Sequence, residues 1–411
     1  MVSVFSCRSL RTVFLAAMLG ALLSSLAGLA QSPELKDAYD QYTKLQAAGR
    51  YTEALRVAEE AVTLGEKEFG AAHTVTANLL SDLANIYRET GNYGRAEPLY
   101  KKALVILEQK VGALHPHWAR VLNNLAVLYW SQGRFKEAEI AHKRALTVRE
   151  KTLGPSHPKV AQSLNNLAEV YRLLGHFTNA RPLYERAVTI LEKTYGAEHP
   201  RVASVLNNAA LLARAEGRYE EAEALFMRAF RIDSKVLGAG HPATSTDLND
   251  LASLYQARGR FDEAELMLKR ALADREKALG PDHPDVAQSL NNLALFHFQR
   301  SQFSIAETGH KRALAVWEKH LGPRHPEIAT SLGNLADVYI ALDRHAEAEA
   351  LYRRALDIRE SALGPEHLHL ATSLDAYAKL LRATGRIAEA VRFENRAKKI
   401  RAKHSIVNSR N

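Results

Sequence analysis

The sequence predicts an all-α protein in which helix pairs are stacked one after another as an α-solenoid. Three observations predict this fold. A phrase that reads "LNNLA" at Leu122 returns every 42 residues along most of the chain. Within each copy, apolar residues recur at three- and four-residue steps, the period of one helical face. Ala, Leu, Glu, Arg and Lys dominate the composition, and proline is sparse, with 13 in 411 residues; these residue types favour helices.

The N-terminal segment is expected to be separate from the repeats. Arg8 and Arg11 precede an uncharged apolar run over residues 13–30. This arrangement is typical of a secretory signal peptide, here residues 1–30. We therefore expect export, to a periplasm or to the outside of the cell. The alternative is a membrane anchor over residues 12–30, because 18 apolar residues lie at the short limit for spanning a bilayer. Contact with a membrane is expected only if the segment is retained.

The repeats account for nearly all of the remaining chain. After a short lead-in over residues 31–37, about nine tandem units are expected over residues 38–397, the first of them degenerate, and a basic cap or tail over residues 398–411. A fixed period of this length indicates a stack of small units in place of two or three globular cores. The phrase recurs at Leu80, Leu122, Leu164, Leu206, Leu248, Leu290, Leu332 and Leu374.

Each unit is expected to form two helices joined by a tight turn. In the copy from Leu122, the first amphipathic run reaches Tyr129, and Gly133 then supplies a residue for which positive φ is easy. A second amphipathic run follows and stops at Gly154. Pro158 suits the first turn of the next helix.

Small side chains in the second helix explain why such units would stack closely. Two alanine columns run through the array, and an aromatic residue follows most of the turn glycines, where it would fill the seam between units. The columns are Ala54, Ala96, Ala138, Ala180, Ala222, Ala264, Ala306, Ala348 and Ala390, and Ala61, Ala103, Ala145, Ala187, Ala229, Ala271, Ala313, Ala355 and Ala397.

These columns resemble the tetratricopeptide repeat, with Leu, Ala and Tyr in the first helix, Gly in the turn and two Ala in the second helix. The 42-residue period and the "LG..HP.VA" linker are similar to the kinesin light chain variety of that repeat. The resemblance covers about residues 38–411 and implies a right-handed solenoid with a concave groove. Ser301 and Asp343 depart from the pattern, because they replace the turn glycine.

Asparagine is a poor residue for a helix interior, so its recurrence needs a reason. The resemblance implies that the third position of the phrase faces the groove, where an amide can donate to and accept from a peptide backbone. The alternative is that these amides bond the adjacent helix and lock the stack, and the sequence leaves both open. The candidate ligand-binding amides are Asn124, Asn166, Asn208, Asn292 and Asn334.

Other groove positions form a mixed surface of cations and aromatic rings. This surface suits an extended peptide with acidic and apolar side chains. It does not match the carboxylate-clamp version of the family, which needs Lys and Arg at set places around the Asn. The candidates are Arg88, Arg120, Trp130, Arg172, Arg214 and Phe298.

A histidine column precedes the first helix of each unit. Metal binding is disfavoured, because one His per unit, with stacked helices about 10 Å apart, cannot satisfy Zn–N bonds of about 2 Å. Turn and capping chemistry is the preferred interpretation. The column is His73, His115, His157, His199, His241, His283, His325 and His367.

The sequence favours a binding protein without catalytic activity, cofactor or metal. Its one cysteine, Cys7, would leave with the signal peptide, and we find no catalytic or phosphate-binding motif. The charge of +9, or +7 without Arg8 and Arg11, is interleaved with acids as on solvated helix faces. Export argues against nucleic acid. We expect a scaffold or adaptor that binds a protein or peptide in its groove; the alternative is a structural or membrane-tethered envelope assembly element that uses its lateral surface.

Overall fold

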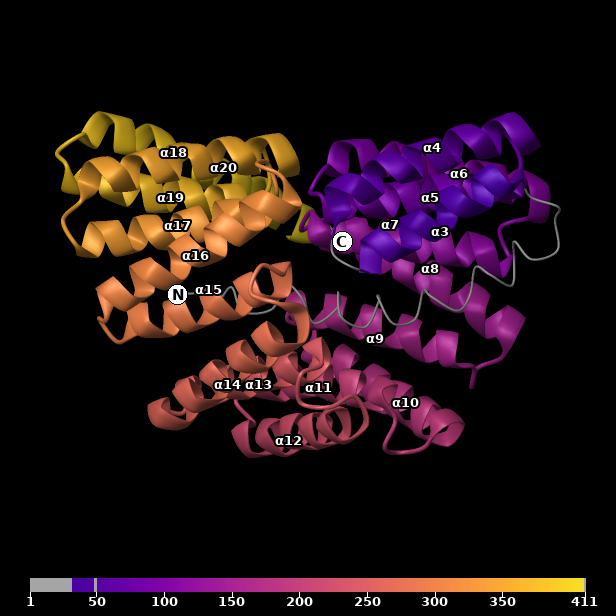
Figure 1. Ribbon diagram of the computed structural model, residues 1–411, viewed down its shortest axis with the longest axis horizontal. Helices are drawn as coiled ribbons and strands as arrows, with labels where there is room; N and C mark the ends of the chain where they lie inside the picture. Colours follow the sequence, from indigo (N-terminus) through magenta and orange to yellow (C-terminus); the bar gives the residue numbers. More distant parts are fainter. Residues whose placement is uncertain (1–31, 48–49, 410–411) are drawn as a thin grey trace. The chain divides into compact units, whose positions relative to one another are not determined.

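The computed structural model describes residues 32–47 and 50–409, so the predicted signal segment lies outside the described part of the chain. The described residues form helices α3 to α20, and no strand occurs among them. The helices follow one another as antiparallel pairs (Figure 1). The prediction of an all-α stack of helix pairs is confirmed.

Each repeat contributes a first and a second helix at the predicted places. The first helices are α3 (Pro33–Ala47), α5 (Thr74–Glu89), α7 (Pro116–Ser131), α9 (Pro158–Leu173), α11 (Pro200–Ala215), α13 (Pro242–Ala257), α15 (Pro284–Gln299), α17 (Pro326–Ala341) and α19 (Leu368–Ala383). The second helices are α4 (Tyr51–Phe69), α6 (Tyr93–Val111), α8 (Phe135–Leu153), α10 (Phe177–Tyr195), α12 (Tyr219–Val236), α14 (Phe261–Leu279), α16 (Phe303–Leu321), α18 (His345–Leu363) and α20 (Ile387–Ser409). The predicted C-terminal tail therefore largely continues α20 as helix.

The chain divides into two compact units. The first comprises Met1–Ile86 and Ala96–Pro281, and the second comprises Tyr87–Arg95 and Asp282–Asn411. The first unit holds the repeats up to α14, and the second holds those from α15 onward. Each unit is described by itself below.

Helix ends follow the chemistry of the linker and the turn. Pro158 opens α9, where its missing N–H costs no hydrogen bond, and Gly154 ends α8 with φ 86°. The turn glycine Gly133 has φ 70°. At the two positions where the sequence replaces that glycine, Ser301 and Asp343 take φ values of 59° and 56°. The turn geometry is thus kept even where a side chain makes it costly.

An arginine at the start of several second helices braces consecutive repeats. Arg134 donates to Glu97 of the preceding repeat at 2.7 Å, also bonds Glu137, and lies 4.1 Å from the ring centroid of Tyr129. A guanidinium placed between two carboxylates and over a ring gains geometric specificity that a lone surface ion pair lacks. The same brace recurs at Arg260 and Arg344.

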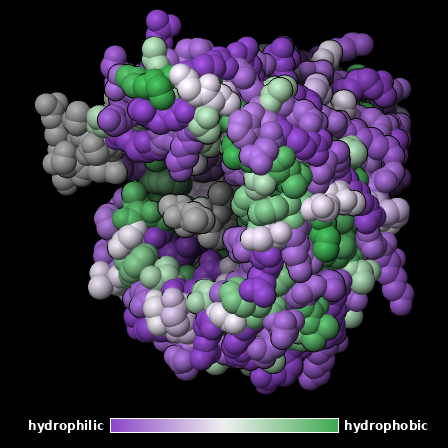
Figure 2. Space-filling view, turned by 90° about the vertical axis from the view of Figure 1, so that its left-hand side faces the viewer, coloured by the Kyte–Doolittle hydropathy of each residue, from purple (hydrophilic) through white to green (hydrophobic). Residues whose placement is uncertain are grey.

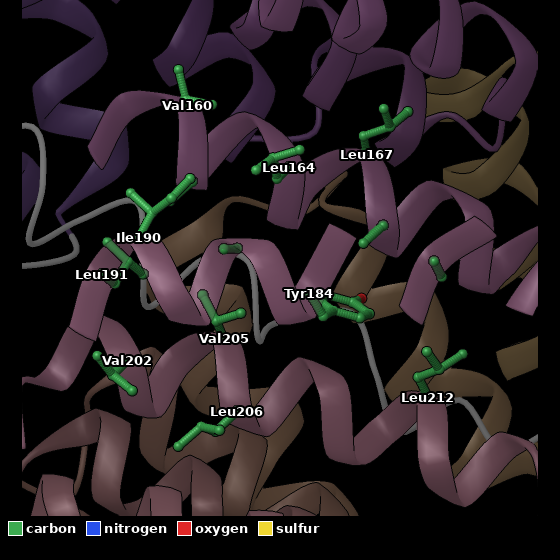
Figure 3. Close-up of a cluster of buried hydrophobic side chains, with 14 of the residues drawn as sticks. Val160, Leu164, Leu167, Tyr184, Ile190, Leu191, Val202, Val205, Leu206 and Leu212 are labelled. Atoms are coloured by element: carbon green, nitrogen blue, oxygen red, sulfur yellow. The ribbon is translucent and has the colours of Figure 1, made fainter. Parts of the chain in front are cut away.

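The core of the first unit is continuous from one repeat to the next. Val160, Leu164 and Leu167 of α9 pack with residues of α10 and α11 such as Tyr184 and Leu206 (Figure 3). Both alanine columns are buried wherever the described helices contain them, so the predicted close approach of helices is confirmed.

The aromatic residues after the turn were expected to fill the seams, and this expectation is only partly met. Phe261 is 37% exposed, and Phe135 and Phe177 are half-buried. The tyrosine that ends the first helix is the better-buried ring, as at Tyr129 and Tyr255. Among the rings after the turn, Tyr93 does fill its seam, since it is only 5% exposed.

The surface is largely hydrophilic, with hydrophobic side chains in separate groups (Figure 2). Among the described residues, no helix combines the length and the apolar character that crossing a bilayer would require.

Candidate peptide-binding face

The first helices of consecutive repeats contact each other directly. In the first unit α9 contacts α11, and α11 contacts α13; in the second unit α15 contacts α17. The second helices pack chiefly against the first helices that flank them in the chain. Because the first helices approach more closely, each stack curves with its first helices on the inner side. The side of these helices that holds the asparagines is called the inner face.

Asparagine side chains bridge neighbouring first helices along this face. Asn166 of α9 donates through Nδ2 to Oδ1 of Asn123 in α7, at 3.2 Å. Asn208 of α11 donates in the same way to Asn165 of α9, at 2.9 Å. The third-position amide of one repeat therefore bonds the second-position amide of the repeat before it.

The third-position amides of the first unit are not open to solvent, although direct contact with a ligand would require it. Asn124, Asn166 and Asn208 are 4%, 2% and 1% exposed. Two of the three spend a donor on the adjacent helix, as the stack-locking alternative requires. Asn124 differs, since its Nδ2 is buried and has no hydrogen-bond partner among the described residues. A direct role of these amides in ligand binding stays a prediction.

A second column of the predicted residues lies two helical turns beyond the bridging amides. Trp130, Arg172 and Arg214 each follow a second-position asparagine by seven residues, which returns to the same helical face. All three are partly exposed. The Nε1 atom of Trp130 is buried and has no hydrogen-bond partner among the described residues. These three side chains give the inner face of the first unit its accessible chemistry.

Arg120 lies one turn before Asn124 and is held by the preceding repeat. It donates to Oδ1 of Asn78 at 2.8 Å, and its Nη1 lies 3.5 Å from a carboxylate oxygen of Asp82. Burial raises the pKa of Asp82, and the nearby guanidinium of Arg120 only partly offsets that effect. The guanidinium of Arg120 is thus held by one amide and one carboxylate of the preceding repeat.

The other two arginines of this face also have carboxylates beside them. Arg172 grips buried Glu169 with two hydrogen bonds of 2.8 and 2.7 Å. Burial opposes its charge, but Glu169 outweighs burial and raises the pKa of the guanidinium. Arg214 bonds Oγ of Ser253 at 2.5 Å. Burial lowers its pKa, and the charge of Asp250 partly offsets that effect. The positive charge of this face is thus largely balanced.

The second unit repeats the pattern with fewer cations. Asn334 donates to Oδ1 of Asn291 at 3.1 Å, and that oxygen also lies 3.0 Å from Nδ1 of His310. Asn292 is buried and accepts from Gln288 at 2.8 Å. Phe298 occupies the register of Trp130 and is partly exposed.

Arg88 also belongs to the second unit, and its guanidinium is paired with Glu89. The structure therefore divides the predicted site residues between the two units: Asn124, Asn166, Asn208, Arg120, Trp130, Arg172 and Arg214 in the first, and Asn292, Asn334, Arg88 and Phe298 in the second.

Sequence reasoning missed two buried arginines, each of which joins a second helix to the next first helix. Arg149 of α8 donates to Oγ of Ser163 in α9 at 2.8 Å and to the Lys159 carbonyl at 3.0 Å. Arg359 bonds Ser373 at the same register. Burial lowers the pKa of Arg149 to about 10. The signal that could have found it is an arginine on the alanine-bearing face of a second helix.

The histidine column caps the first helices, as the capping interpretation predicts. His157 accepts through Nδ1 from the backbone N–H of Lys159 at 3.1 Å, and His199 does the same for Arg201. Six further histidines of the column make this bond. The cap needs a neutral ring, and burial lowers the pKa of His157, His199 and His241 accordingly. No cluster of three or more metal-ligating side chains occurs within the described ranges.

Family models agree with this architecture along nearly the whole array. A model of the tetratricopeptide repeat matches residues 45–109, 119–193, 164–235, 201–277, 285–361 and 327–403. A second model of that repeat matches residues 81–155 and 249–315. The chain is a tetratricopeptide repeat protein. Folds of this family are typical of protein–protein interaction, and its members are generally non-catalytic.

Solved structures share the repeat. A Rap protein complexed with competence and sporulation factor is 15% identical, covers 90% of this chain and 99% of its own, and has a TM-score of 0.56. Putative kinesin light chain repeats from Podospora anserina are 30% identical and have a TM-score of 0.41. The match covers 50% of this chain and 97% of theirs. BtubC from P. vanneervenii is 22% identical, with a TM-score of 0.44 and 57% and 91% covered.

The likeness to the Rap protein bears on the fold alone. The predicted resemblance to tetratricopeptide repeats of the kinesin light chain kind is confirmed. A comparison with curated proteins finds no match.

Proposed function

We propose that this protein is a non-catalytic scaffold that binds a protein or an extended peptide on the inner face of its first helices. The observation that supports this most is the position of Trp130 and Phe298. Each is a partly exposed aromatic side chain on the inner face, one in each unit, at the same register of the repeat. Large rings of this kind are the usual anchors of protein interfaces.

The charge of the inner face refines the expected ligand. Arg120, Arg172 and Arg214 were expected to favour acidic side chains. Each has a carboxylate near it, from Asp82, Glu169 or Asp250, so a strongly acidic ligand would meet little uncompensated positive charge. We infer an extended peptide with apolar or aromatic anchors that pack against the exposed parts of rings such as Trp130.

The test compares ring removal on the inner face with a matched change on the outer face. Trp130→Ala is compared with Ile140→Ala, since Ile140 lies in the same repeat and is 68% exposed on α8. Phe298→Ala and Ile305→Ala are the corresponding pair in the second unit. Each variant is used as bait in an envelope extract of the native host, and the retained partners are quantified.

The two outcomes separate the two functions. Loss of partners with Trp130→Ala and Phe298→Ala, and retention with the isoleucine variants, supports the inner face. The opposite result supports an assembly element that binds through its lateral surface. That alternative draws on exposed apolar residues of the second helices, namely Ile140 and Leu266, which lie three repeats apart at one register.

We further propose that residues 1–30 direct export and that the mature chain begins near Gln31. The basic residues Arg8 and Arg11 ahead of an uncharged run support this proposal. N-terminal sequencing of protein from the native host tests it. A chain that keeps Met1 in a soluble cytoplasmic fraction would contradict export, and one that keeps it in the membrane fraction would favour the anchor.

A further inference from the structure

The seam between α12 and α13 has different chemistry from the seams at the same register elsewhere. Where α8 meets α9, this register holds Arg149 and Ser163, which bond each other. The α18–α19 seam uses Arg359 and Ser373 in the same way. At α12–α13, the sequence places Asp233 and Asp247 in these two positions, each 84 residues beyond its counterpart at α8–α9. A donor–acceptor pair is thus replaced by two acids.

Both carboxyls are buried, and each has an oxygen without a hydrogen-bond partner. Asp233 and Asp247 are each 3% exposed. Oδ1 of Asp247 accepts from Asn207 at 2.9 Å, but its Oδ2 and Oδ1 of Asp233 have no hydrogen-bond partner among the described residues. A buried, unpaired carboxylate is costly, and two like charges in one buried site cannot both be kept.

The neighbouring helices do not supply a cation to the pair. The nearest further acid is Asp250 of α13. Arg214 of α11 acts on Asp250 and bonds Ser253. Arg275 of α14 bonds Oγ1 of Thr246 at 2.9 Å and the Pro242 carbonyl.

Arg172 of α9 is gripped by Glu169. Among the described residues, burial is the one effect that shifts the pKa of Asp233, and no cation opposes it. Since no cation is committed to the pair, a proton is the remaining way to reduce its charge.

We propose that Asp233 and Asp247 share a proton and that losing this proton loosens the α12–α13 seam. Burial raises the pKa of Asp233 to about 7 and raises that of Asp247 well above its usual range, an effect that the charge of Asp233 reinforces. The seam is closed while the pair holds a proton. It is weakened as the pH rises through about 7, because two charges then face each other without solvent.

The consequence is local, since units of a repeat stack are held mainly by their neighbours. Opening this seam would separate α12 from α13 and leave the α8–α9 seam in place. If the pair loses its proton between pH 6 and 8, this one seam of the first unit would respond to pH on its own.

Hydrogen exchange read by mass spectrometry at pH 6, 7 and 8, corrected for intrinsic exchange rates, tests the proposal on the full chain. Peptides of α12 and α13 report the acid seam, and peptides of α8 and α9 serve as the internal reference. We expect the opening constant of α12–α13 to rise about tenfold or more from pH 6 to 8, since one proton is lost through a pKa about 3 units above that of the open form. The α8–α9 peptides should not show this rise: they should stay constant between pH 7 and 8 and should be no better protected at pH 6.

Two variants at the pair and one control distinguish titration of the buried acids from titration elsewhere on the chain. Asp247→Asn and Asp233→Asn keep the shape, remove one titrating group and place an amide donor beside the carboxyl that remains, so each should reduce the tenfold rise. Asp262→Asn, at an exposed acid on α14, should leave the rise unchanged. If both pair variants retain the rise, or if wild-type α12–α13 follows α8–α9 at every pH, the proposal is wrong. Failure of one variant to fold leaves the other and the wild-type comparison decisive.

A divalent cation is the competing occupant of two facing carboxyls. The same exchange measurement is repeated at pH 8 with Mg²⁺ or Ca²⁺ added. No change in α12–α13 protection agrees with a shared proton. A cation-dependent gain that Asp247→Asn removes would overturn the proposal, because the pair would then hold a metal ion.

Discussion

The α8–α9 and α12–α13 seams occupy the same place in two repeats of one unit and differ in the sign of their response to pH. At α8–α9, Arg149 of α8 bonds Ser163 of α9. The fully buried ring of His142 lies two helical turns before Arg149 on α8. At α12–α13, two acids face each other in place of the Arg–Ser pair. The repeat that contains α8 is expected to lose stability in acid, and the α12–α13 seam is expected to weaken in alkali. The repeat therefore fixes geometry, while single positions in it set the conditions under which a seam holds.

The largest expected effect concerns the buried His142 of α8 in acid. Burial lowers the pKa of His142 to about 3, and Arg149 adds to the effect. The unfolded chain binds a proton at this residue near pH 6.5 and the folded chain does not, so stability is complete above pH 6.5 and falls as the pH drops toward 3. The loss is about 1.4 kcal/mol per pH unit and up to about 5 kcal/mol in all.

His142→Phe provides the control, because Phe226 occupies the equivalent buried position in α12. Urea unfolding at pH 7 and pH 4.5, followed by circular dichroism, should show a smaller acid loss in this variant. Equal acid losses in variant and parent would remove His142 as the source.

The amide bridges should matter nearly as much, and they test how regular the inner face is. Asn166→Ala and Asn208→Ala each leave a buried acceptor unpaired, on Asn123 and Asn165, at a cost of about 1–3 kcal/mol per bridge. Asn124→Ala is the matched control, because Nδ2 of Asn124 has no partner among the described residues. Thermal unfolding at pH 7 measures the difference. If the variant with both Asn166→Ala and Asn208→Ala has a free energy of unfolding within about 0.5 kcal/mol of the parent, these amides again become candidates for ligand binding.

Exchanging the chemistry of the two seams tests their difference most directly. Asp233→Arg combined with Asp247→Ser rebuilds the Arg149–Ser163 arrangement between α12 and α13. We expect a gain of about 1–3 kcal/mol at pH 8, where the acid pair is charged, and little change at pH 6. The urea midpoint is measured at both values. A variant that gains equally at pH 6 and 8 would show that packing, and not charge, weakens the parent seam.

A substitution at a turn of the second unit gives the smallest effect and a baseline without charge. Ser301 holds a φ of 59°, where the other described turns at this position, Asp343 apart, have glycine. Ser301→Gly should stabilise the folded protein by about 0.5–1 kcal/mol at every pH. Glycine removes the strain of the left-handed conformation, and the larger conformational entropy that it loses on folding offsets only part of this gain. Gly133→Ala should destabilise by a similar amount. Loss of stability in Ser301→Gly would mean that the hydroxyl group contributes more than the strain costs.

By itself the sequence determined the repeat, its two helices and the ends of each helix. Periodicity is a local property: an apolar stripe such as that from Leu122 to Tyr129 must be buried, Gly133 must turn, and Pro158 can only open a helix. The histidine caps followed from the same local chemistry. Even the departures at Ser301 and Asp343 were visible as missing glycines.

Only the tertiary structure decided between the two roles open to the asparagines. Asn166 and Asn208 have one sequence pattern whether they face solvent or the next helix, because that choice depends on where a neighbour 43 residues away comes to lie. The Asp233–Asp247 pair escaped notice for the same reason. Its two residues belong to different helices, and an acid on a helix has no unusual chemistry until packing removes its water and places a second acid beside it.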